Sequence, residues 1–120
     1  MIERLITFPE NVLGFIYKGH ISKADYDSVL VPAINNALNK QERLRLYVET
    51  DATFLGIGPG AIWEDFKVGV EHLKRWERVV VVTDVEWLKN TMRLFSFLMP
   101  GAMKAFPVAE SARARAWIME

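Results

Sequence analysis

The chain has 120 residues, and 15 Lys and Arg residues balance 15 Asp and Glu residues, so its formal net charge is zero. Such a chain has no overall field that attracts nucleic acid or anionic lipid, and the lack of cysteine excludes disulfides and thiolate metal sites. The N-terminus lacks the apolar run of a secretory signal, and the longest apolar stretch, Leu94 to Met103, is far shorter than the roughly 20 residues that span a bilayer. We therefore expect a soluble cytoplasmic protein that does not cross a membrane but could touch one.

The first third of the chain predicts a hairpin followed by a helix. Leu5 to Phe8 and Val12 to Lys18 are β-rich runs separated by a few turn residues, which is the spacing of a hairpin. The segment from Ser22 to Asp25 is a capping box, after which apolar residues recur at helical spacing as far as Leu38. Pro32 lies inside that pattern. Because proline removes an N–H, we expect the helix to bend there or to begin late.

The rest of the chain alternates strands and helices. Val79 to Val82 is the strongest predicted strand, because an unbroken β-branched run indicates burial on both faces. The other predicted elements are a strand from Leu44 to Glu49, helices from Ala61 to Trp76 and from Trp87 to Leu98, a strand from Met103 to Phe106 and a helix from Ser111 to Met119. The order ββαβαβαβα predicts one α/β domain over residues 1–120, with a mixed, mostly parallel sheet of about five strands and helices packed against it.

Short stretches spread over most of the chain carry a resemblance to a known family. They are Trp63 to Lys67, Glu77 to Asp84, Trp87-Leu88, Phe95 to Gly101, Phe106-Pro107 and Ala114 to Trp117. With the order of elements, they resemble the SpoIIAA-like branch of the STAS superfamily, the fold of the anti-sigma-factor antagonists. The resemblance implies a mixed sheet with packed helices and a regulatory role. In those antagonists a partner kinase phosphorylates a serine at the start of the helix that follows the third strand. The corresponding loop here, residues 50–60, has no serine, which leaves Thr50 and Thr53 as the possible phosphorylation sites.

A glycine-rich loop precedes the helix predicted from Ala61. Gly56, Gly58 and Gly60 could form a nest of N–H groups for a phosphate or carboxylate, helped by the helix dipole. The loop lacks the lysine and the Ser/Thr of a P-loop, and its spacing does not fit a dinucleotide-binding fingerprint. The alternative is that the glycines only allow a tight turn.

The helix that begins at Trp87 carries more apolar side chains than one packed face needs. At about 100° per residue they cover an arc of roughly 220°, about twice what packing against a sheet requires. The surplus could line an apolar pocket, form a homodimer face or enter a membrane surface close to Arg93 and Lys104; the alternative is that a neighbouring helix covers it. The residues predicted to bind a ligand are Gly58, Gly60, Trp63, Phe66, Trp87, Leu94, Phe97 and Leu98.

No pattern of residues predicts catalysis, a metal site or a cofactor. The acidic residues are explained as solvated charges and helix caps, and the two histidines have no recognisable nucleophile beside them and no metal-ligand spacing; these residues are Glu49, Asp51, Glu64, Asp65, His20 and His72. We therefore predict a non-enzymatic module. It would bind a small apolar or amphipathic ligand, or a membrane surface, between the second and third helices. The alternative is a protein-interaction module of the anti-sigma-antagonist type that phosphorylation switches.

Overall fold

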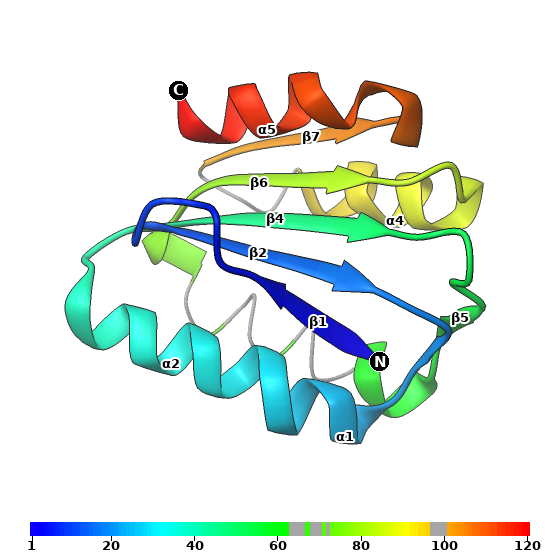
Figure 1. Cartoon of the computed structure of the whole chain (residues 1–120). Helices are drawn as coiled ribbons and strands as arrows, with labels where there is room; N and C mark the ends of the chain where they lie inside the picture. The colour runs from blue at the N-terminus through cyan, green and yellow to red at the C-terminus, as the bar shows by residue number, and fades with distance from the viewer. Residues whose placement is uncertain (63–66, 68–70, 72, 97–100) are drawn as a thin grey trace.

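The computed structural model of the chain describes residues 1–62, 67, 71, 73–96 and 101–120 (Figure 1). Its main sheet has the strand order β1-β2-β4-β6-β7, formed by β1 (Ile2–Leu5), β2 (Val12–Tyr17), β4 (Leu44–Thr50), β6 (Trp76–Val82) and β7 (Ala102–Phe106). The strands β1 and β2 are antiparallel, and every other pair is parallel. The predicted fold class, a mixed and mostly parallel sheet with packed helices, is confirmed.

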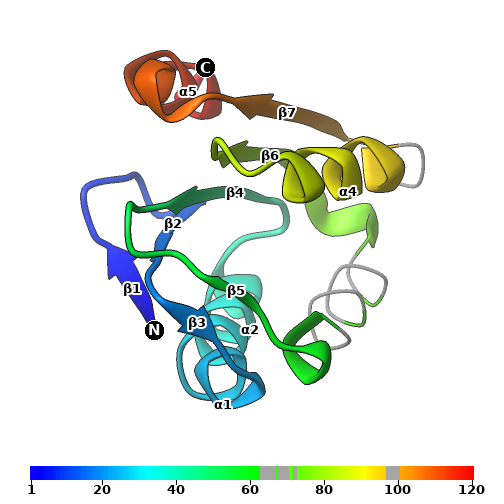
Figure 2. The same cartoon turned by 90° about the vertical axis from the view of Figure 1, so that its right-hand side faces the viewer.

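Helices cover both faces of this sheet. They are α1 (Lys23–Asp25), the π-helical turn η1 (Tyr26–Leu30), α2 (Val31–Lys40), the 3-10 turns η2 (Leu73–Arg75) and η3 (Val108–Glu110), α4 (Glu86–Ser96) and α5 (Ser111–Met119); residues 59–62 are helical as well. Figure 2 shows α5 on one side of the sheet and α2 and α4 on the other. We call these sides the α5 face and the α4 face.

Strand alternation divides the core into two layers. On the α4 face, side chains such as Phe15, Val48 and Val81 pack with the residues of α2 and with Leu88 of α4. On the α5 face, Tyr47 and Val80 pack with side chains of α5. The strand β6 is buried on both sides, as its run of valines predicts, because successive side chains of a strand point to opposite faces.

The helical segment after β3 begins as the sequence predicts. Ser22 accepts a hydrogen bond from the Asp25 backbone N–H and the Asp25 carboxylate accepts one from the Ser22 N–H, so the capping box is present. The segment does not begin late, because α1, η1 and α2 follow one another without a break from Lys23 to Lys40. The irregularity lies just before Pro32. The turn before α2 is π-helical, with the Val31 N–H bonded to the Tyr26 carbonyl, and Pro32 follows in the first turn of α2, where it needs no N–H.

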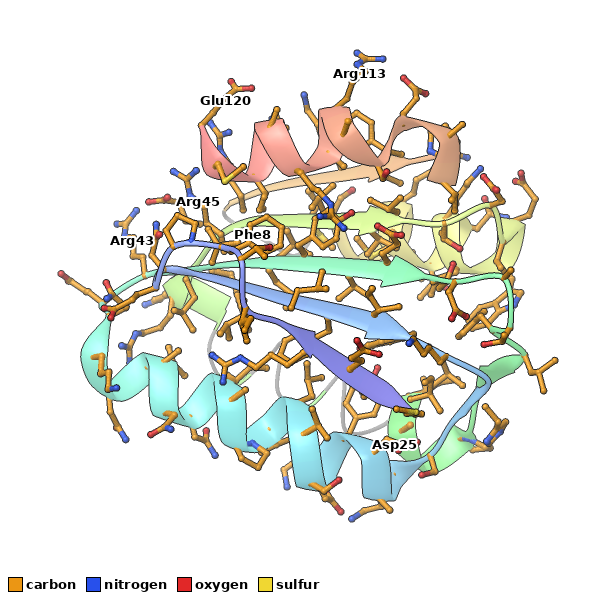
Figure 3. All side chains as sticks on the ribbon, in the orientation of Figure 1. Phe8, Asp25, Arg43, Arg45, Arg113 and Glu120 are labelled. Carbon is orange, nitrogen blue, oxygen red and sulfur yellow. The ribbon has the colours of Figure 1, made fainter. Side chains whose placement is uncertain are left out.

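The first strand lies earlier than predicted. It spans Ile2–Leu5, and the loop that follows folds over the α5 face (Figure 3). The ring of Phe8 lies where a side chain at Gly14 would be, since a Cβ there would come within 2.6 Å of the ring, and it also packs on Tyr47 with ring centroids 5.2 Å apart. Phe8 therefore covers the sheet from a loop and is not part of a strand.

The helix predicted to end at Trp76 ends earlier. Trp76 begins β6 and is buried in the core of the α4 face, opposite Leu44 and beside an irregularity in the β4–β6 register. The backbone at the start of β6 also lies very close to Gly101, the residue before β7. A Cβ at Gly101 would lie 2.6 Å from the carbonyl oxygens of Trp76 and Glu77, so only glycine allows this close approach of the two chains.

Candidate functional site

The glycine loop forms a second, two-stranded sheet that the sequence did not indicate. The strands β3 (His20–Ile21) and β5 (Gly56–Ile57) pair in parallel, and the N–H of buried Gly58 donates to the Ile21 carbonyl at 2.8 Å. This bond occupies a donor that the predicted anion-binding nest would need, and this corrects the expectation for Gly58. Gly60 is exposed, and a Cβ there would contact the Lys23 side chain at 3.3 Å.

The helix α4 has apolar side chains on its outer side as well as its inner side. Leu88 is buried and Met92 is half-buried against the core. Trp87 and Leu94, seven residues apart and hence on one side of the helix, are 44% and 69% exposed. The predicted apolar surplus of this helix is therefore present at these two positions. Trp63, Phe66, Phe97 and Leu98, which the sequence also assigned to ligand binding, lie outside the described residues.

A loop after β4 extends this outer side. The ring of Phe54 stacks on Trp87, with ring centroids 6.5 Å apart and planes 29° apart, and the adjacent Leu55 is 82% exposed. We call Phe54, Leu55, Trp87 and Leu94 the apolar surface. Sequence reasoning missed the first two, although a pair of large apolar residues inside a glycine-rich loop was a usable signal. Phe54, Leu55 and Trp87 follow the ends of the parallel strands β4 and β6, which is the usual ligand side of such sheets, and Leu94 lies two turns further along α4.

The described residues form a shallow depression beside this surface. Met92, Arg93 and Ser96 of α4 and Met103, Lys104 and Ala105 of β7 line it, and its volume is about 70 Å³. Pockets that enclose small molecules usually measure about 300 Å³ or more. This depression is therefore too small to enclose a ligand, so binding here would take place on an open surface.

The two threonines proposed for phosphorylation differ in exposure. Thr50 is 3% exposed and its hydroxyl donates to the Thr83 hydroxyl at 2.8 Å, so a kinase would have to open the end of β4 to reach it. Thr53 is exposed. Its hydroxyl donates to the Asp51 carboxylate at 2.7 Å and accepts the Gly19 N–H at 3.2 Å. These bonds tie the loop of the apolar surface to the turn after β2, where Gly19 has φ +61°.

The acidic side chains at this end of the sheet bond to neighbouring groups. The hydrogen bond from the Thr53 hydroxyl, followed by the Thr53 N–H, lowers the pKa of Asp51. Glu49 accepts a hydrogen bond from Tyr47 at 2.5 Å and lies 3.8 Å from Arg115. Burial, reinforced by this bond to Glu49, raises the pKa of Tyr47 to about 12. Among the described residues no three His, Cys, Asp or Glu side chains are grouped as metal ligands; Glu64, Asp65 and His72 lie outside that part of the chain.

Arginines bond to the carbonyl ends of two helices. Arg75 donates to the carbonyls of Leu38, Gln41 and Glu42 at the end of α2. Arg45 and Arg78 donate to carbonyls at the end of α5, and Arg45 points from β4 toward that end (Figure 3). Cations and donors of this kind satisfy helix C-termini, so these arginines have a structural role.

Comparisons with known proteins agree on the fold. The family model described as SpoIIAA-like matches residues 12–119. A solved structure of an uncharacterised protein from the DUF3478 family, with a SpoIIAA-like fold, from Shewanella loihica PV-4 is similar, with a TM-score of 0.75 and 24% identity over 98% of this chain and 93% of that chain. No curated protein matches the chain. In the described part of the chain, no helix has the length and hydropathy to cross a membrane.

Proposed function

The chain belongs to the SpoIIAA-like family, and from this premise we propose that it is a non-enzymatic STAS-type module whose apolar surface binds a lipid bilayer or an amphipathic lipid-like molecule. One observation carries the proposal: α4 fills the core with Leu88 and Met92 and still exposes Trp87 and Leu94. Burying a leucine side chain contributes about 1.5–3 kcal/mol, so an exposed leucine and tryptophan on one side of a helix offer a partner substantial binding energy.

An open membrane surface fits this geometry better than an enclosed ligand. The depression beside the surface holds only about 70 Å³, whereas a bilayer needs no cavity. Helices that lie in a membrane interface have an apolar side with tryptophan or leucine and a cation near its border, and α4 has both, with Arg93 next to Leu94. The apolar surface would enter the acyl region, and Arg93 would remain among the headgroups.

The charges near the surface predict how binding depends on lipid. Asp51, Asp84 and Glu86 lie at the same end of the sheet as Trp87. The Glu86 carboxylate is 3.8 Å from the amine of Lys89, and Asp51 interacts with Lys18. These acids offset the attraction of Arg93 to an anionic bilayer. We expect affinities for phosphatidylcholine and phosphatidylglycerol vesicles that agree within about threefold, because apolar contact dominates the binding.

Vesicle flotation with two matched variants tests the proposal. Leu94→Asp places a charge on the apolar surface, and we expect at least about tenfold weaker binding, the equivalent of losing about 1.4 kcal/mol of leucine burial. Ile6→Asp is the control, because Ile6 is 87% exposed in the β1–β2 loop and is not part of the surface. A blue shift of Trp87 fluorescence on vesicle addition is expected to disappear in Trp87→Phe. Equal loss of binding in both aspartate variants, or no binding by the wild-type protein, would refute the proposal.

A second candidate function is supported by the position of Thr53. We propose that a protein partner contacts the same loop and that phosphorylation of Thr53 releases it. A phosphate there would replace the hydroxyl that bonds Asp51 and Gly19 and would be repelled by the Asp51 carboxylate, so the loop that carries Phe54 and Leu55 would rearrange. Thr53→Asp is expected to release a co-purifying partner, whereas Thr53→Ser retains it. Intact mass without phosphate, together with an empty pull-down, would count against this function.

A further inference from the structure

The strand β7 is an edge of the main sheet. It pairs with β6 on one side, and in the described part of the chain no strand lies on its other side. The Phe106 carbonyl accepts the Thr83 N–H of the chain that continues β6. Backbone groups alternate in direction along a strand, so those of Phe106, Lys104 and Ala102 point toward β6, and those of Met103 and Ala105 point outward. The edge therefore presents two outward N–H groups and two outward carbonyls.

The depression beside α4 follows this edge. Three consecutive residues of β7, Met103 to Ala105, line it together with α4. Because successive side chains of a strand point to opposite faces, a depression lined by three in a row runs along the backbone and not over one face. Its floor contains the half-buried side chains of Met92 and Met103, and Arg93 is exposed at its border.

The two flanks of the edge differ in chemistry. On the α4 face an added strand would meet the methionines. On the α5 face it would meet Lys104, whose amine lies 5.0 Å from the centre of the Trp117 ring. A strand whose apolar side chains face α4 and whose acidic side chains face Lys104 complements both flanks. We propose that β7 accepts, as an additional strand, an extended segment of a partner protein in which acidic and apolar residues alternate.

A second copy of this chain fits the edge less well. Antiparallel pairing of two β7 strands through their outward groups at Met103 and Ala105 would place Lys104 directly opposite Lys104 of the other copy. Like charges directly opposite destabilise a strand pair. The same lysine favours a partner that brings an acidic side chain to this position. This site goes beyond the lipid-binding role, because it uses the backbone of β7 and none of the residues of the apolar surface.

Fluorescence polarisation with two labelled hexapeptides tests the inference. In one peptide glutamate alternates with valine, and in the other lysine alternates with valine. Ala105→Pro removes an outward N–H and leaves the bonds to β6, while Ala105→Ser keeps that N–H and serves as the control. We expect the wild-type protein to prefer the glutamate peptide, and Ala105→Pro to bind it about tenfold or more weakly than Ala105→Ser. Lys104→Glu is expected to reverse the preference between the peptides.

Backbone hydrogen exchange keeps the test decisive if Ala105→Pro fails to fold, as judged by circular dichroism. Added glutamate peptide is expected to slow exchange at the Met103 and Ala105 amides of the wild-type protein, because those N–H groups enter new hydrogen bonds. Unchanged exchange at both amides would overturn the inference. So would equal peptide affinity in folded Ala105→Pro and Ala105→Ser proteins, or no binding of either peptide up to about 1 mM.

Discussion

Replacing Arg75 by alanine should destabilise the protein by about 2 kcal/mol. Its guanidinium donates three hydrogen bonds of 2.7–2.8 Å to carbonyls at the end of α2. A hydrogen bond from a charged donor contributes about 1.5–3 kcal/mol when buried, but Arg75 is only half-buried and water can replace part of each bond, so we take about 0.5 kcal/mol for each. The favourable interaction of the cation with the helix dipole adds about 0.5 kcal/mol. A loss of this size lowers the melting temperature of a domain of this length by about 8 °C.

Urea unfolding followed by circular dichroism and tryptophan fluorescence measures this loss at constant m-value. Arg75→Lys keeps the charge but reaches fewer carbonyls, so we expect it to lose about 1 kcal/mol. Lys74→Ala changes an exposed neighbour and is expected to stay within about 0.5 kcal/mol of the wild-type protein. If Arg75→Ala loses less than about 0.5 kcal/mol, or Arg75→Lys loses nothing, the capping of α2 by Arg75 is not what stabilises this corner of the fold.

Four further substitutions test local features of the structure. Gly101→Ala should cost about 1–3 kcal/mol in thermal unfolding, because the new Cβ would lie 2.6 Å from two backbone carbonyl oxygens. Gly60→Ala brings the new Cβ only to 3.3 Å from the Lys23 Cβ, which needs a shift of a few tenths of an ångström, so it should cost less than about 1 kcal/mol. Burial, reinforced by a bond to a carboxylate, raises the pKa of Tyr47 from 10.0 to about 12, so folding favours the neutral phenol. The free energy of unfolding should therefore fall as pH rises from 10 toward 12, and urea titrations of Tyr47→Phe should show a flatter profile there. Ser22→Ala should cost about 1 kcal/mol through loss of the capping box. The Ser22 N–H and hydroxyl lower the pKa of Asp25, so the stability that this carboxylate contributes is lost as pH falls below about 3.8. In Ser22→Ala the hydroxyl is gone, and NMR titration should show a higher pKa for Asp25 than in the wild-type protein.

Features that depend on neighbours in the chain were predictable. The capping box at Ser22, the irregular helical turn just before Pro32 and the buried run of β6 each depend on residues within a few positions of one another. The surplus of apolar side chains on α4 was also predictable, because it depends only on helical periodicity, and the exposure of Trp87 and Leu94 agrees with it. Short-range hydrogen bonding, sterics and periodicity act before any tertiary contact forms.

Features that depend on distant segments were not predictable. The sequence around Phe8 favours a strand, but its ring covers Gly14 from a loop. Arg75 lies on what would be a charged helix face, but it bonds to the end of α2 more than 30 residues earlier in the chain. The glycine loop could have formed a nest for an anion or only a tight turn, but Gly56 pairs with β3 and the Gly58 N–H donates to its Ile21 carbonyl. In each case the side chain or N–H could make contacts of similar energy with several groups, and the residues next to it in the chain do not determine which contact forms.

The amino-acid sequence by itself determined the order of elements, the buried centre of the sheet and the excess apolar surface of α4, since these follow from periodicity and from the burial of apolar side chains. Only the tertiary structure decided which groups remain available for function. Pairing across the sheet occupies the Gly58 N–H and buries Thr50, while it leaves Thr53, Leu94 and the outer edge of β7 exposed. Exposure is a property of the whole packed chain, because the segments that cover a residue can come from anywhere in the sequence.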